Sequence, residues 1–136
     1  MALTVATNLA VETVDWSQLD TILLDMDGTL LDLEFDNLLW GTVSPERWGQ
    51  ERGLDVSASQ ATLAPLFKEV RGTLDWYCLD YWSQKLSLDI PTIKTGYSEG
   101  IRWRPQAETF LRHLNTSHLD VVLITNAHPV PLAMKA

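Results

Sequence analysis

The fold of this 136-residue chain follows first from nine residues, Thr21-Ile22-Leu23-Leu24-Asp25-Met26-Asp27-Gly28-Thr29. The first four are apolar or β-branched without alternation, which predicts a short strand that is buried on both faces. Two carboxylates and a glycine follow at the point where this strand ends. A buried strand that ends in polar residues is typical of a parallel sheet in an α/β protein.

A second apolar run, Val121-Val122-Leu123-Ile124, ends in Thr125-Asn126 and has the same character. The residues before it predict a helix that starts with Pro105 as its first residue and ends at Asn115. Helix followed by buried strand again predicts an α/β fold with a parallel sheet. Ligands of such sheets bind beyond the carboxyl ends of neighbouring strands, where both polar segments would lie.

The residues between these strands predict a small helical insertion. Ser44-Pro45 is typical of a helix start and Gly53 of its end, while Ser57 with Gln60 resembles a capping box. Apolar residues alternating three and four apart predict a helix or helix pair with one buried face: Leu63, Phe67, Val70, Leu74, Tyr77 and Tyr81. The predicted division is a core at residues 14–32 and 104–136, with a helical cap at residues 33–103.

The strongest chemical pattern is Asp25-x-Asp27-Gly28-Thr29. A carboxylate held at a rigid strand end can attack phosphorus in line, and its oxygens suit Mg²⁺. Asp27, two residues on, points to the same side of an extended segment and can act as a general acid and base. Gly28 permits a turn whose N–H groups can approach a phosphate. Two solvated carboxylates or a helix cap are the alternative for the pair alone.

Thr125 and Asn126 offer a hydroxyl and a free N–H for the oxygens of a transferring phosphoryl group. Taken alone, such a pair at a strand end is usually turn chemistry. With the Asp25 loop on the neighbouring strand, we interpret both residues as phosphate ligands. They complete the candidate site of Asp25, Asp27, Gly28, Thr125 and Asn126.

Several other residues are weaker candidates. Asp32, Asp36 and Asn37 are expected to be solvated or to cap a helix, and the loop residue His128 to be exposed. The pairs Trp76-Tyr77 and Tyr81-Trp82 could stack on a base, although aromatic residues at helical spacing usually form a core. Arg102 and Arg104 are expected to be exposed. Cys78 is expected to be a buried and inert thiol.

Composition narrows the class of protein. A formal charge of −8 disfavours tight binding to nucleic acid or to an anionic membrane, and a phosphate substrate would need a cation to approach. The single cysteine excludes an internal disulfide framework. No apolar run approaches ~20 residues, and the first residues do not resemble a signal peptide, so a cytoplasmic protein is expected. The sequence gives no indication of the oligomeric state.

The segment from Asp25 to Asp32 resembles the first motif of the haloacid dehalogenase superfamily, and Thr125-Asn126 is similar to its second. Phe35-Asp36-Asn37, the stretch 74–82 and Thr125-Asn126-Ala127-His128-Pro129 resemble bacterial nucleotidases that act on GMP and IMP. The resemblance implies Asp25 as the nucleophile that becomes an aspartyl-phosphate, and Asp27 as the general acid and base. It implies Mg²⁺ bound by the Asp25 carboxylate and the Asp27 carbonyl, with phosphate on Thr125 and Asn126, and a nucleotide as the substrate.

The third motif of the superfamily, a lysine, and the fourth, an acidic pair, have no counterpart here. Lys135 is only ten residues beyond Thr125 and is not assigned the third role, and Asp120 begins its strand. The chain is therefore expected to be the N-terminal portion of a longer enzyme, with activity near background when alone. The alternatives are a truncated domain without catalysis, and another phosphatase or phosphomutase with the same cap type.

Overall fold

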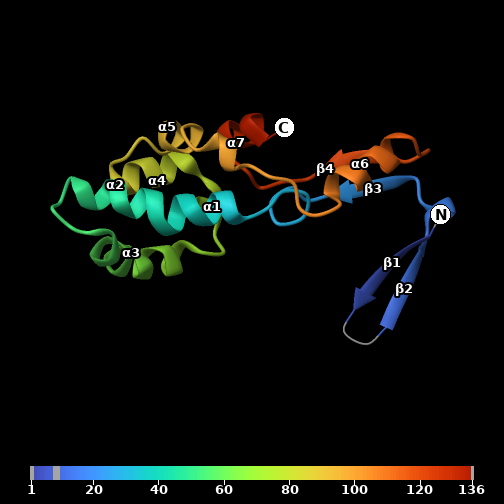
Figure 1. Cartoon of the computed structure of the whole chain (residues 1–136), viewed down its shortest axis with the longest axis horizontal. Helices are drawn as coiled ribbons and strands as arrows, with labels where there is room; N and C mark the ends of the chain where they lie inside the picture. Colours follow the sequence, from blue (N-terminus) through green and yellow to red (C-terminus); the bar gives the residue numbers. More distant parts are fainter. Residues whose placement is uncertain (1, 8–9, 136) are drawn as a thin grey trace.

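The computed structural model of the chain describes residues 2–7 and 10–135. The strands are β1 (Ala2–Thr7), β2 (Ala10–Asp15), β3 (Thr21–Leu24) and β4 (Asp120–Leu123). The α-helices are α1 (Glu34–Leu38), α2 (Ser44–Gln50), α3 (Val56–Val70), α4 (Leu79–Leu86), α5 (Ile90–Thr95), α6 (Ala107–Asn115) and α7 (Pro129–Lys135). Helices α1 to α5 gather with α7 at one end of the molecule, and β3, β4 and α6 lie at the other (Figure 1).

The parallel pair of β3 and β4 is the predicted sheet. Thr21 pairs with Asp120 and Leu24 with Leu123, and the Ile124 amide donates to the Leu24 carbonyl at 2.7 Å. Parallel strands have their carboxyl ends at the same edge of a sheet, so the segments after Leu24 and Leu123 leave it side by side. The sheet therefore brings the two polar segments of the sequence to one edge.

These strands are more exposed than predicted. Leu23 is 62% exposed and Ile124 is 54% exposed, so the prediction of two strands buried on both faces is wrong. The reason is that the described residues contribute two strands to this sheet, and α6 packs with Leu24 and Leu30 on one side of it. The residues that the structure describes leave Leu23 and Ile124 uncovered.

Helix α6 begins two residues later than predicted. Gln106 has a φ of 67°, a left-handed conformation that interrupts a right-handed helix, so the first helical residue is Ala107 rather than Pro105. The predicted end at Asn115 is confirmed. Phe110 of this helix meets Trp16 edge to face, with 6.2 Å between the ring centroids.

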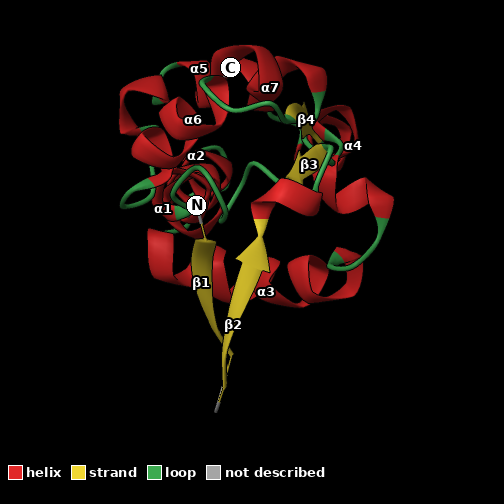
Figure 2. Cartoon of the chain, turned by 90° about the vertical axis from the view of Figure 1, so that its right-hand side faces the viewer, coloured by secondary structure: helices red, strands yellow, loops and turns green. Residues whose placement is uncertain are grey.

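A hairpin of β1 and β2 was not among the predicted elements. The two strands pair antiparallel from Ala2 with Asp15 to Thr7 with Ala10, and the hairpin extends away from the helices (Figure 2). The β-branched residues Val5 and Val11 are the kind of sequence signal that favours such strands.

Trp82 is the centre of the helical segment. It is 1% exposed, and its ring meets the rings of Trp40, Phe67, Trp76 and Tyr81 at centroid distances of 5.2 to 5.9 Å. Leu63, Val70, Leu79, Leu86 and Ile90 complete this core. The expectation that the aromatic residues form a core is therefore confirmed for Trp82. The predicted apolar stripe is buried at Leu63 and Val70, but it is wrong for Leu74 and Tyr77, which are 82% and 43% exposed in the turn after α3.

The predicted helix boundaries are only partly correct. Helix α2 begins at Ser44 as predicted, although it continues directly from α1 through a π-helical turn at Leu39–Val43. The Asp55 carboxylate accepts from the Ala58 amide at 2.7 Å and caps α3, so the predicted capping box of Ser57 and Gln60 is wrong. Gly72, with a φ of 85°, turns the chain after α3.

Replacing Gly49 by alanine is expected to destabilise the helical segment by about 1–3 kcal/mol. A Cβ at this position would overlap the Ser59 hydroxyl and would lie 2.9 Å from the Leu54 carbonyl oxygen. Urea denaturation followed by tryptophan fluorescence measures the change. Gly41→Ala is the matched control, because its Cβ would have no neighbour within 4 Å and should not destabilise the protein. Equal stability of both variants would contradict the packing of α2 against α3.

None of the helices in the described part of the chain is both long enough and apolar enough to cross a membrane.

Candidate active site

The loop after β3 presents two carboxylates while its middle residue is anchored in the protein. Met26 is buried, and its carbonyl accepts from the amides of Leu30 and Leu31 at 2.9 and 3.0 Å. Asp25 is exposed and Asp27 is half-buried. Alternation along the extended segment therefore directs Met26 to the core and leaves both aspartates available at the edge of the sheet.

Gly28 gives this loop its shape. Its φ of 78° is unfavourable for other residues, and a Cβ there would lie 3.2 Å from the side chain of Leu33. The Gly28 amide donates to the Leu31 carbonyl at 2.8 Å, so it is engaged within the loop. The predicted role of Gly28 in binding phosphate through its amide stays a prediction, whereas its role in turning the chain is clear.

Thr125 and Asn126 follow β4 at the same edge of the sheet. The Thr125 hydroxyl accepts from the Ala127 amide at 3.1 Å, and Ala127 lines the same cleft as Asp27. Thr125 is half-buried and Asn126 is exposed. The structure thus brings the two predicted segments together, and their predicted roles as phosphate ligands stay predictions.

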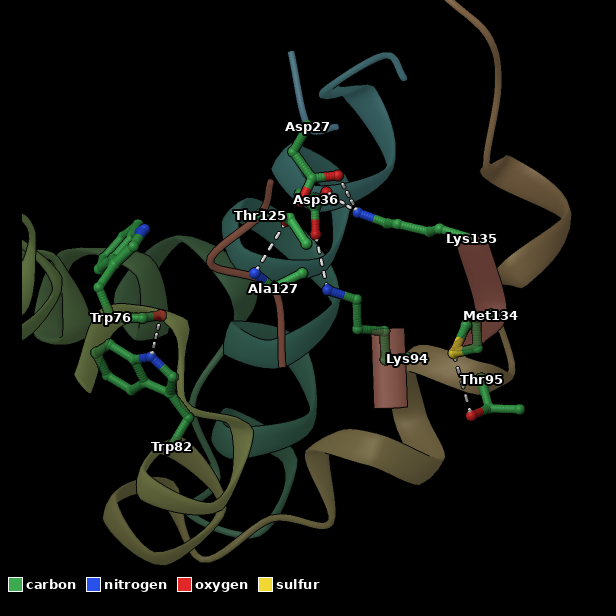
Figure 3. A network of polar contacts seen from close by, with 10 residues as sticks. All are labelled: Asp27, Asp36, Trp76, Trp82, Lys94, Thr95, Thr125, Ala127, Met134 and Lys135. Carbon is green, nitrogen blue, oxygen red and sulfur yellow. Dashed lines mark hydrogen bonds and ion pairs between the residues drawn. The ribbon is translucent and has the colours of Figure 1, made fainter. Parts of the chain in front are cut away.

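A buried network of ion pairs joins the loop to three helices (Figure 3). The Lys135 ammonium lies 2.6 Å from the Asp27 carboxylate and 2.7 Å from that of Asp36. The other oxygen of Asp36 accepts from the Lys94 ammonium at 2.7 Å. The side chains of Lys135 and Lys94 are only 1% and 5% exposed. Asp36 of α1 therefore links Lys94 of α5 to Lys135 of α7, which in turn contacts the predicted acid and base.

The charges of this network shift two pKa values. Burial alone would raise the pKa of Asp36, but attraction to Lys94 and hydrogen bonds from Lys135 and Lys94 outweigh it, so the pKa lies below its ordinary value of 3.8. Burial lowers the pKa of Lys94 from its ordinary 10.5, and the ion pair with Asp36 opposes this shift only in part. Both pKa shifts fit an arrangement in which the single carboxylate of Asp36 pairs with two ammonium groups.

This network was not predicted from the sequence. Asp36 was expected to be solvated or to cap a helix, and that expectation is wrong. Lys94 was not considered, and Lys135 was considered but given no role. The sequence offers the charges but not their partners, because Asp36 and Lys94 are 58 residues apart and meet only through the fold. His128 was expected to be exposed, but its side chain is only 17% exposed and lies 3.6 Å from Asp80.

A cleft of about 440 Å³ extends from the loop into the helical segment. Its polar end is lined by Asp27, Asp36 and Lys94, and aromatic side chains line the part formed by the helices. The remaining lining residues are Leu33, Asn37, Trp40, Gly41, Phe67, Arg71, Trp76, Tyr77, Leu79, Ala127, His128 and Pro131. Its volume falls within the ordinary range for small-molecule sites of about 300–1,000 Å³. The cleft thus combines a charged end, where a cation would be needed to hold a phosphate beside the carboxylates, with an apolar region suited to a flat ring.

The oxygen atoms at the loop are of the type that Mg²⁺ prefers. One oxygen of Asp25 accepts from the Met26 amide at 2.8 Å, and the carboxylate itself is exposed. Mg²⁺ commonly binds one or two protein carboxylates and completes its shell with water and substrate phosphate, so Asp25 and Asp27 fit this ion. Among the residues that the structure describes, no group of three or more His, Cys, Asp or Glu side chains could hold a metal.

The chain is similar to three known proteins. It is 43% identical over 122 residues to the GMP/IMP nucleotidase YrfG of Escherichia coli (strain K12) and equally to that of Shigella flexneri. Each match covers 90% of this chain and 55% of the relative, so the chain spans about half the length of these relatives. The crystal structure of a HAD phosphatase from Thermococcus onnurineus matches with a TM-score of 0.72 and 16% identity, over 85% of this chain and 55% of that one. No protein-family model matches the chain.

The predicted fold class is thereby confirmed, as a haloacid dehalogenase-type α/β fold with helices inserted between its two parallel strands. The predicted resemblance to GMP/IMP nucleotidases is confirmed as well. The domain boundaries at 14–32, 33–103 and 104–136 stay predictions. Helix α7, in the last of these segments, lies against α5 of the inserted helices (Figure 1).

Proposed function

We propose that this chain, whose fold is that of the haloacid dehalogenase-type phosphatases, carries the nucleophile and the substrate cleft of a Mg²⁺-dependent phosphomonoester hydrolase. The proposed substrates are purine nucleoside 5′-monophosphates. The observation that carries the proposal is the position of Asp25 and Asp27 at a strand end, with Asp27 at the charged end of a cleft whose other end contains the aromatic side chains of Trp40, Phe67, Trp76 and Tyr77. The GMP/IMP nucleotidases that are 43% identical to this chain support the substrate class.

In the proposed reaction, a carboxylate oxygen of Asp25 attacks phosphorus and the bond from phosphorus to the substrate oxygen breaks. Asp27 in its protonated form donates a proton to the departing alkoxide. Asp27 as a carboxylate then takes a proton from the water that attacks the aspartyl-phosphate, which releases phosphate and restores both side chains. Asp25 and Asp27 are separated by one residue on the same loop, so Asp25 can act as the nucleophile and Asp27 as the proton carrier in both steps.

Positive charge at this site would stabilise the phosphoryl group during transfer. Lys135 contacts Asp27 directly, and Lys94 lines the cleft. Fixed cations near a transferring phosphoryl group are among the largest contributions to its catalysis. When bound, Mg²⁺ would add further positive charge, held by the Asp25 carboxylate and the Asp27 carbonyl. Thr125 and Asn126 are the proposed ligands of the phosphoryl oxygens.

The inserted helices are proposed to act as a cap that excludes water and selects the substrate. Asp36 and Lys94 belong to these helices and Asp27 to the loop, so the ion-pair network connects the cap to the catalytic residues through Lys135. A nucleotide whose phosphate lies near Asp27 could extend its base along the cleft toward the aromatic rings.

Calorimetric titration of the whole chain tests this proposal. Turnover by this chain is expected to be near background, so binding of intact ligand can be measured. We expect GMP and IMP to bind in the presence of Mg²⁺ at least about tenfold more tightly than UMP or glucose 6-phosphate, a difference of about 1.4 kcal/mol. Excess EDTA should remove most of the affinity.

A preference for the sugar phosphate would instead favour another phosphatase or a phosphomutase, which is the second candidate. Binding that does not depend on Mg²⁺ would contradict the proposed metal site. Equal binding of all four ligands would contradict the proposed substrate class.

A further inference from the structure

The aromatic end of the cleft, which consists of Trp40, Phe67, Arg71, Trp76 and Tyr77, is built as a rigid wall. The rings of Trp40 and Phe67 meet edge to face at 6.2 Å, and those of Phe67 and Trp76 at 6.4 Å. The buried ring of Trp82 lies behind them and contacts three of these rings. A wall of rings that support one another keeps its shape when a ligand binds, which lowers the entropic cost of binding.

Hydrogen bonds to the backbone of Trp76 also hold this residue in place. The indole N–H of Trp82 donates to the Trp76 carbonyl at 3.0 Å, as Figure 3 shows. The Trp76 amide donates to the Thr73 carbonyl at 3.3 Å in the turn after α3. Figure 3 also shows Trp76 and Trp82 well apart from Asp27 and Lys135, so this wall belongs to the end of the cleft remote from the catalytic loop.

Arg71 is the cation at this end of the cleft. It directly follows α3, and its guanidinium carbon lies 5.3 Å from the centroid of the Trp76 ring. Its side chain is exposed, and no ion pair joins it to another residue in the described part of the chain. The Trp76 ring orients the guanidinium, while its N–H groups remain available to a ligand.

The planar fork of an arginine matches one edge of a 6-oxopurine. Guanine and hypoxanthine both present the two acceptors O6 and N7 on this edge, and arginine donates to both at once. Adenine has an amino donor in place of O6, so one of the two N–H groups of the fork would face another donor. Guanine and hypoxanthine differ only at C2, which lies away from this edge.

We propose that Arg71 is the specificity-determining residue of the cleft, and that it reads the O6 and N7 edge of a 6-oxopurine base packed against the aromatic wall. This inference rests on the proposed function, which it deepens from purine nucleotides in general to 6-oxopurine nucleotides. It predicts that a single arginine accepts both GMP and IMP and discriminates against AMP.

The test is calorimetric titration of the whole chain and its variants with GMP, IMP and AMP in the presence of Mg²⁺. Arg71→Met keeps much of the packing over Trp76 but removes the fork. It is expected to weaken binding of GMP and IMP by about 10- to 100-fold. Binding of AMP is expected to change by less than about twofold, because AMP gains little from a fork that it matches at only one position. The preference for 6-oxopurines should therefore disappear.

Arg52→Met is the matched control. Arg52 stacks over the Trp48 ring at 4.2 Å, as Arg71 does over Trp76, but it does not line the cleft. This variant should leave the ratio of GMP to AMP affinity unchanged. Arg71→Lys is a second variant that keeps the positive charge and should still lose most of the discrimination, because an ammonium lacks the planar fork. Circular dichroism establishes that each variant is folded.

Equal weakening of GMP and AMP in the Arg71 variants would overturn the inference, since Arg71 would then act only through the aromatic wall. Persistence of the GMP preference in both variants would also overturn it. The proposed function has a separate readout, which is the Mg²⁺-dependent binding of beryllium trifluoride to the catalytic loop. If that complex forms while the base preference is independent of Arg71, the inference fails and the proposed function stands.

Discussion

Asp25→Asn is expected to abolish the Mg²⁺-dependent complex of the chain with beryllium trifluoride, an analogue of a phosphoryl group bonded to a carboxylate. The carboxylate oxygen of Asp25 is the proposed bonding atom, and the neutral amide is both a poorer nucleophile and a poorer ligand for a hard cation. We expect a loss in affinity of at least about 10³-fold, the order that follows removal of a group acting directly on the reacting centre. The fluorine NMR resonance of the bound species measures the complex.

Asp32→Asn is the control for this experiment. Asp32 lies in the same segment and its carboxylate accepts from the Glu34 amide at 2.6 Å at the start of α1, outside the cleft. Asparagine can accept the same hydrogen bond, so the variant loses one negative charge and little else. A bound fluorine resonance that survives in Asp25→Asn would show that Asp25 is not the nucleophile. Equal loss of the resonance in Asp32→Asn would show that the effect is not specific to Asp25.

Asp36→Asn is expected to lower the free energy of unfolding by about 3–5 kcal/mol. The substitution leaves the buried ammonium of Lys94 without its carboxylate and removes one of the two carboxylates that contact Lys135. Urea denaturation at neutral pH measures the loss. The double variant Asp36→Asn with Lys94→Met should recover part of it, because the buried unpaired charge is removed together with its partner. A loss below about 0.5 kcal/mol would mean that the network is no more stabilising than a surface ion pair.

The pH dependence gives a second signature of the same group. The pKa of Asp36 is lower in the folded protein than its ordinary value of 3.8, so the unfolded chain takes up the proton first as the pH falls. Its contribution to stability is therefore complete above this value and is lost as the pH falls through the lower pKa of the folded state. The Asp36→Asn variant should lack this part of the acid dependence.

The chemistry of the loop could be predicted because it depends on neighbours in the sequence. Asp25, Asp27 and Gly28 are within four residues, and a strand before them is enough to place them at one edge of a sheet. Thr125 could be added because the parallel arrangement is the usual consequence of a helix between two apolar strands. The structure confirms this arrangement through the pairing of β3 with β4.

The lysine partners of Asp36 could not be predicted in the same way. Lys94 and Lys135 approach this carboxylate from helices far along the chain, and no periodicity indicates which of the ten basic residues will do so. Arg71 is similar, since its relation to Trp76 depends on the positive φ of Gly72 and on the turn that follows. Charged residues that are far apart in the sequence are brought together by tertiary packing, and tertiary packing cannot be predicted from a local sequence pattern.

The prediction of strand burial failed for a related reason. A continuous apolar run indicates which residues would gain from being covered, but it does not state how many neighbouring elements are present to cover them. Helix α6 covers the side of the sheet that holds Leu24, while Leu23 points away from this core. Apolar composition therefore predicted the strand itself correctly and its surroundings incorrectly.

The uncovered side of β3 and β4 has a consequence for the colloidal behaviour of the chain. Leu23 and Ile124 are exposed apolar side chains on this side of the sheet. The strand edges beside them carry amides that can pair with another polypeptide, and this combination promotes self-association. The formal charge of −8 opposes such encounters by repulsion between molecules. Since this repulsion is screened within about 8 Å at physiological ionic strength, we expect added salt to promote association of the chains.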